Sequence, residues 1–168
     1  MRVTVLIMTI AAAGGACHRA PTRPKVAPPE HRFVIEGATI ERLRTDRPAY
    51  EVEADRLVMS QDSKRVQATN VKIHTRSSSG TPVTVTAPNG SGDRTAETAK
   101  LWGGVQVESQ GVILRSRSAE LDWRRQQLVA SSTVTAKGAN FDARARNGTY
   151  RIDEERVVMD GPVSARVR

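Results

Sequence analysis

Apolar and polar residues alternate with a period of two along most of this 168-residue chain. The alternation is clear at residues 83–86, 105–107 and 118–123, where every second side chain is apolar or small. From residue 33 onward, no segment sustains the 3.6-residue apolar period of an amphipathic helix. Val is also far more frequent than Leu, which is typical of strands. The sequence therefore predicts an all-β domain over residues 33–168.

Clusters rich in Gly, Asn, Asp and Ser separate the alternating segments and predict turns between strands of ordinary length. These clusters lie at residues 61–63, 77–80, 89–93, 110–111, 137–138, 147–148, 153–154 and 160–162.

A weak internal repeat runs through this domain. In each unit a small residue opens an outgoing strand, a polar turn follows, and a returning strand leads to small residues and then a Val. These Val residues are 71, 105, 134 and 163, and they are 34, 29 and 29 residues apart. Such periods indicate stacked supersecondary units, with the small residues at a bend. The alternative is a coincidence within an ordinary β-sandwich.

The N-terminal segment differs from the domain. Arg2, an apolar stretch over residues 3–13 and small residues before Cys17 are typical of a secretory signal, which predicts a signal peptide over residues 1–16. Cys17 is the single cysteine, which excludes a disulfide framework, and its position predicts a lipid anchor. Residues 17–32 contain several prolines and predict an extended tether. The alternative is an ordinary signal peptide with an incidental thiol at Cys17.

Composition narrows the class of partner. The formal charge is +8, which favours an anionic partner. Aromatic residues make up only 4% of the chain, too few for a platform that stacks single-stranded nucleic acid. Export from the cytoplasm also argues against nucleic acid. The expected anions are lipid phosphates, and a membrane is expected at the N-terminal anchor.

Catalytic motifs are not recognisable. His18 and His31 lie in the tether and His74 stands alone, so no His pair has metal-ligand spacing. The serine clusters lack a nearby His base, and Gly103-Gly104 lacks the lysine of a phosphate-binding loop. We therefore expect no enzyme activity, no metal and no cofactor.

The repeat units at 119–136 and 145–165, and less closely those at 54–73 and 87–107, resemble the OstA-like β-jellyroll repeats of the bacterial lipopolysaccharide-transport system. The opening residues 33–40 and 50–54 are similar to those of the LptC family in that system. This resemblance implies a twisted antiparallel jellyroll with a slot between two sheets. It also implies a periplasm-facing protein, held at the inner membrane, that shields the acyl chains of lipopolysaccharide. Its implied partners are the inner-membrane ABC transporter and an LptA-like bridge protein.

The resemblance also suggests which residues act. Apolar residues expected to line the slot are Val85, Leu101, Val105, Val107, Leu114, Leu121, Trp123, Val134 and Val163. Basic residues expected to pair with lipid phosphates are Arg115, Arg117, Arg144 and Arg146. The plain alternatives are a packed core for the first set and protection of strand edges for the second.

The C-terminal residues Val163, Ala165 and Val167 are expected to form an edge strand that pairs with the bridge protein. Two other functions remain open. The chain could be a soluble LptA-like bridge subunit, or a structural β-solenoid lipoprotein of the cell envelope without a ligand.

Overall fold

The computed structural model describes residues 32–42 and 50–167, which form twelve antiparallel strands in one continuous sheet. The strands are β1 (Arg32–Arg42), β2 (Tyr50–Ser60), β3 (Arg65–Arg76), β4 (Pro82–Asp93), β5 (Thr98–Ser109), β6 (Val112–Asp122), β7 (Gln127–Ala130), β8 (Val134–Lys137), β9 (Phe141–Ala145), β10 (Asn147–Arg151), β11 (Arg156–Asp160) and β12 (Ser164–Val167). Within those ranges, no helix is long and apolar enough to cross a membrane. The proposed signal peptide, Cys17 and nearly all of the tether lie outside the described residues.

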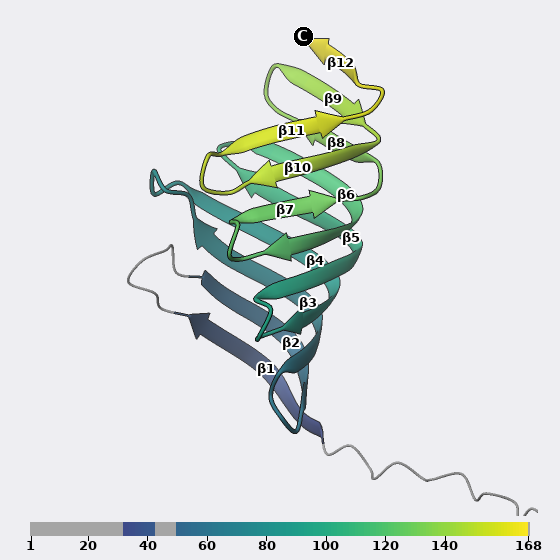
Figure 1. Cartoon of the computed structure of the whole chain (residues 1–168). Coiled ribbons are helices and arrows are strands. Elements are labelled where there is room, and N and C mark those ends of the chain that lie inside the picture. Colours follow the sequence, from purple (N-terminus) through teal and green to yellow (C-terminus); the bar gives the residue numbers. More distant parts are fainter. Residues whose placement is uncertain (1–31, 43–49, 168) are drawn as a thin grey trace, which may run out of the picture.

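The sheet starts as a meander and forks at β6. Strands β1 to β6 pair in sequence order. The C-terminal end of β6 then pairs with β7, which continues to β10 and β11, and its N-terminal end pairs with β8, which continues to β9 and β12. Figure 1 shows the strands stacked along one axis from β1 to β12, with the sheet folded over on itself.

A line of bends divides the sheet into two facing walls. The register between neighbouring strands is interrupted at Gly37, Asn70, Gly103 and Gly104, all of which have positive φ. We call the half that contains β7, β10 and β11 the first wall, and the half that contains β8, β9 and β12 the second wall. Each of the long strands β1 to β6 contributes to both walls, and the space between them is the slot.

Period-two alternation directs one face of each wall into the slot. On the second wall an unbroken row of paired apolar residues crosses nine strands: Ile40, Val52, Ile73, Val85, Val107, Leu114, Ala136, Ala143 and Ala165. On the first wall the corresponding row from β2 to β6 is Leu57, Ala68, Gly90, Leu101 and Ala119. Most of these side chains, together with residues of the later strands, belong to or pack against one hydrophobic cluster.

The repeat is visible in the turns of the first wall. Ser63, Glu97, Gln126 and Glu155 each have positive φ, and they are spaced by the same 34, 29 and 29 residues as the Val positions. Consecutive turns are joined by backbone hydrogen bonds from Arg94 N to Lys64 O, from Trp123 N to Glu97 O and from Ile152 N to Gln126 O. The turns therefore stack as a ladder along the rim of the slot.

Two predicted turns are wrong. Residues 89–93 lie within β4, and the turn follows at residues 94–97. Residues 147–148 open β10. In both places glycine faces another strand closely: a Cβ on Gly90 would lie 3.1 Å from side-chain carbons of Leu101 and Val71, and one on Gly148 would lie 3.3 Å from Val134 Cγ2. These glycines allow close packing, which their residue type alone does not distinguish from a turn.

Candidate functional site

A cavity of about 580 Å³ opens between the walls in the half of the slot nearer β1. Its apolar lining comes from both walls and includes Ile40, Val52, Leu57, Val66, Ala68, Val71, Ile73, Ala99, Leu101 and Trp123. The volume falls within the range of pockets that hold small ligands. The cavity is therefore large enough to accept apolar chains.

The cavity is hollow because the first wall presents small residues there. Ala68, Gly90, Gly92 and Ala99 occupy neighbouring inward positions on β3, β4 and β5. The side chains of Val66 and Leu101 occupy the space that a side chain on these glycines would need. A Cβ on Gly92 would lie 2.8 Å from Val66 Cγ2, and one on Gly90 would lie 3.1 Å from Leu101 Cδ2. A row of Val or Leu at these positions would fill the slot.

Two aromatic rings bound the cavity on the side toward β12. Tyr50, at the start of β2 in the second wall, stacks on Trp123 of the first wall with ring centroids 3.8 Å apart and planes 11° apart. Beyond this stack the slot is filled by fully buried side chains, among them Val83, Leu121 and Ile152. Two cavities in that half measure about 20 and 130 Å³.

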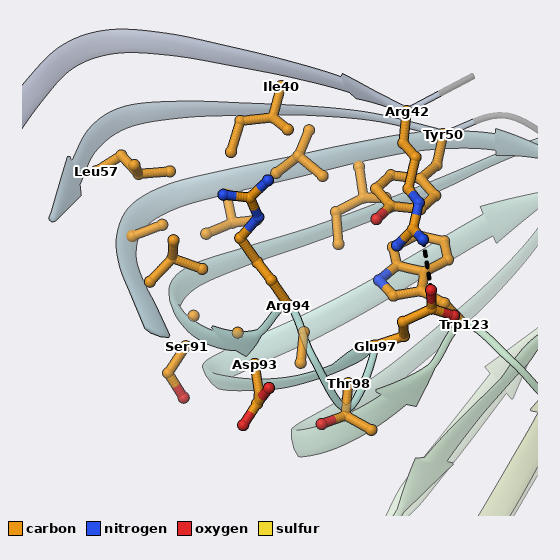
Figure 2. A pocket seen from close by; sticks show the side chains of 18 of the residues that line it. Ile40, Arg42, Tyr50, Leu57, Ser91, Asp93, Arg94, Glu97, Thr98 and Trp123 are labelled. Atoms are coloured by element: carbon orange, nitrogen blue, oxygen red, sulfur yellow. Dashed lines mark hydrogen bonds and ion pairs between the residues drawn. The ribbon is translucent and has the colours of Figure 1, made fainter. Parts of the chain in front are cut away.

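A charged pair spans the walls beside the aromatic stack. Arg42 Nη2, at the end of β1, donates to Glu97 Oε1 in the β4–β5 turn, and Figure 2 shows this contact over the Tyr50 and Trp123 rings. Hydrogen bonds to Tyr50 and Glu97 raise the pKa of Arg42, so the guanidinium keeps its charge. Arg124 Nε also lies 3.6 Å from Glu97 Oε2. These contacts fix the rim where the open part of the slot ends.

Two carboxylates at the mouth of the cavity are bound within their own turns. Asp62 Oδ1 accepts from Ser60 Oγ and Lys64 N, and Asp93 Oδ1 accepts from the N–H groups of Thr95 and Ala96. Hydrogen bonds from Ser60 and from Ala96, respectively, are the main causes that lower the pKa of Asp62 and of Asp93. Both side chains are therefore ionised near neutral pH.

A second contact closes the slot toward β12. Glu155, in the β10–β11 turn, accepts hydrogen bonds from Ser77 Oγ at 2.5 Å and from Ser79 Oγ and Gln110 Nε2. The donors belong to two turns of the second wall. Hydrogen bonds from Ser77 and then Ser79 hold the pKa of Glu155 below its usual value.

The predicted slot residues divide into three groups. Leu101 and Trp123 line the cavity. Six others are buried in the filled part of the slot or against it: Val85, Val105, Val107, Leu114, Leu121 and Val134. Val163 precedes β12 and is 52% exposed, outside the cavity. Whether any of them contacts a lipid stays a prediction.

The four predicted phosphate-binding arginines, Arg115, Arg117, Arg144 and Arg146, are exposed, and none lines the 580 Å³ cavity. Arg115 Nε donates to Gln106 Oε1 at 3.0 Å, and Arg115 is among the residues that border the 20 Å³ cavity. Three basic residues that the sequence did not single out, Arg42, Lys64 and Arg94, line the 580 Å³ cavity. Lys64 and Arg94 each directly follow a turn cluster of the sequence, at residues 61–63 and 89–93, and this placement was the available signal.

The C-terminal segment forms a strand with one partner among the described residues. β12 pairs with β9, and Ala165 and Val167 lie opposite Ala143 and Phe141. Residues 163–167 are all exposed, Val167 at 81%. The described ranges hold no group of His, Cys, Asp and Glu side chains arranged for a metal ion.

Comparisons with known proteins agree with this geometry. A family model described as lipopolysaccharide-assembly, LptC-related, matches residues 3–167. The structure is similar to that of LptH from Pseudomonas aeruginosa, the LptA homologous periplasmic component of the conserved lipopolysaccharide transport device, with a TM-score of 0.56 and 10% sequence identity. The likeness covers 71% of this chain and 94% of LptH, and at this identity it shows a shared fold. No curated protein shows a significant sequence match to the chain.

Proposed function

Because the chain belongs to the LptC-related family of lipopolysaccharide-assembly proteins, we propose that it carries lipopolysaccharide by holding acyl chains in the open half of its slot. The protein is a component of the periplasmic lipopolysaccharide-transport bridge, and its all-β jellyroll is the fold of LptH. The proposed role is non-enzymatic: the slot shields the lipid while another component supplies the energy for its movement.

The apolar cavity of about 580 Å³ is the observation that carries this proposal. Each methylene group moved from water into such a space contributes about 0.8 kcal/mol. A few buried methylenes therefore suffice for reversible binding, and the filled half of the slot limits how far chains can enter. Reversible, partial burial suits a protein that must pass its lipid on.

The ends of the chain complete the proposal. Residues 1–16 would be removed as a signal peptide, and acylated Cys17 would hold the domain at the inner membrane beside the ABC transporter. The 14 residues 18–31 between Cys17 and β1, extended at ~3.1 Å each, would reach about 40 Å. Strand β12 would pair with an LptA-like bridge protein through its free edge.

The test is photocrosslinking in cells from a probe on the cavity wall. We expect a probe at Val66, which lines the cavity, to capture lipopolysaccharide. A probe at Thr135, exposed on the outer face of β8, is the matched control and should capture none. Equal capture from both positions, or none from Val66 in a folded protein, would contradict the proposal and favour a structural lipoprotein without a ligand.

A further inference from the structure

Arg94 places a positive charge at the apolar cavity. It is the first residue after β4, and its side chain lines the cavity together with Ile40 and Leu57. Figure 2 shows this side chain extending into the cavity from the rim, whereas Asp93 and Ser91 point away from it. A guanidinium beside such a surface can bury its aliphatic stem and keep its charged head at the opening.

Within the part of the chain that the structure describes, the guanidinium of Arg94 makes one hydrogen bond and no ion pair. Its Nη1 donates to the backbone carbonyl of Ser63 at 3.2 Å, and no carboxylate lies within ion-pair distance among those residues. The adjacent Asp62 and Asp93 each use one oxygen to bind their own turn. Lys64, on the same rim, adds a second cation. Arg42 differs, because it is held by Glu97.

We propose that Arg94 binds the anionic headgroup, a phosphate, of the amphiphile whose chains enter the cavity. This inference rests on the proposed function and assigns its headgroup site. A guanidinium offers five N–H donors in a planar fork that matches phosphate oxygens. Because one side of the site is apolar protein, the attraction is screened less than at an open surface. Lys64 adds to the attraction for a phosphate, and the ionised Asp62 and Asp93 at the same mouth reduce it.

The location distinguishes this site from the arginines on the outer faces of the walls. Arg115 and Arg144 face away from the slot, so a headgroup bound to them would leave its chains outside the cavity. A headgroup at Arg94 sits at the opening with its chains directed inward. One residue then sets both the orientation of the lipid and the preference for a phosphorylated headgroup.

The test compares three lipids that differ only in charge: lipid A with two phosphates, with one, and with none, each presented to the purified full chain in the same detergent. We expect the wild type to bind the phosphorylated forms more tightly. Arg94→Gln should lower that affinity about tenfold, the loss typical of one charge-assisted contact, and should lower the affinity for dephosphorylated lipid by clearly less. Arg94→Lys should recover part of the loss, and Arg115→Gln should change neither affinity.

Each other outcome has a distinct meaning. If Arg94→Gln binds all three lipids as the wild type does, or weakens all three equally, Arg94 is not the headgroup site, while the cavity proposal stands. If the wild type binds none of the lipids, the proposed function fails. A titration with inorganic phosphate separates the sources: saturable binding that matches the lipid affinity would show a site for free anions and overturn the headgroup assignment.

Discussion

At the scale of single residues, Glu155 joins parts of the chain that are far apart in sequence. Its carboxylate in the first wall receives the hydroxyls of Ser77 and Ser79 and the amide of Gln110 from the second wall. Ser78 Oγ reinforces the contact by donating to Asp153 O at 2.6 Å. These bonds favour the ionised carboxylate, so they stabilise the closed end of the slot only while Glu155 carries its charge.

The prediction for Glu155 concerns pH. Because its pKa is lowered on folding, its contribution to stability is present above its unfolded pKa of about 4.3 and is lost as the pH falls through the lower folded value. Glu155→Gln should therefore lower the Tm at pH 7, and its difference from the wild type should shrink below pH ~4. Calorimetry across this range measures both quantities.

The neighbouring Glu154 gives the matched control. Its carboxylate pairs with Arg151 within one exposed turn and does not span the slot. Glu154→Gln should leave the Tm nearly unchanged at every pH. A Glu155→Gln protein that melts with the wild type at pH 7 would show that the contact does not stabilise the fold.

At the scale of elements, the line of bends turns one sheet into two walls. In β5 the bend is made by Gly103 and Gly104, with φ of +92° and +111°. These conformations are strained for any residue with a Cβ. The two sites differ in surroundings, because a Cβ on Gly103 would lie 3.2 Å from Pro88 Cβ and Asn89 Nδ2, whereas a Cβ on Gly104 would meet nothing within 4 Å.

This pair predicts a graded loss of stability. Gly104→Ala should cost about 1–3 kcal/mol in the free energy of unfolding, the range for backbone strain alone. Gly103→Ala should cost more, because Pro88 and Asn89 must also shift. Urea unfolding of the three proteins measures the difference. A Gly103→Ala protein as stable as the wild type would mean that β5 can bend without left-handed residues.

Features that depend on residues close together in the sequence could be predicted. Alternation in 83–86 and 118–123 predicted an all-β chain and the inward positions of Val85 and Leu121, because a period of two fixes the face of a strand. The repeat and its bends at Asn70 and Gly103 were also visible in the sequence. The left-handed turn conformation of Glu97 and Gln126 could not be predicted from the sequence, since these residue types rarely adopt positive φ.

The cavity was harder to predict than the strands because it depends on pairing across the slot. Arg42 meets Glu97, and Ser77 meets Glu155, only after the walls face each other. Residues 89–93 look like a turn because two glycines lie close together, but they form the thin wall of the cavity. The period-two pattern identifies which side chains point into the slot. It does not show where those side chains are too small to fill the slot and leave a cavity.

At the scale of the whole molecule, the two ends of the sheet are different. At the β1 end the slot is open, and Phe33 and Ile35 on β1 are exposed. At the other end the slot is filled, and the sheet finishes at the edges of β11 and β12. The open and the filled halves of the slot therefore lie at opposite ends of the sheet.

The last prediction concerns the edge of β12. An unpaired strand edge offers main-chain donors and acceptors to another strand, and Val167 on β12 is 81% exposed. We expect a photocrosslinking probe at Val167 to capture an LptA-like bridge protein in cells. A probe at Thr135 should capture none, because β8 already pairs with β6 and β9 on its two edges. If Val167 captures no neighbour while the Val66 probe still captures lipid, the chain binds lipopolysaccharide but passes it on through another surface.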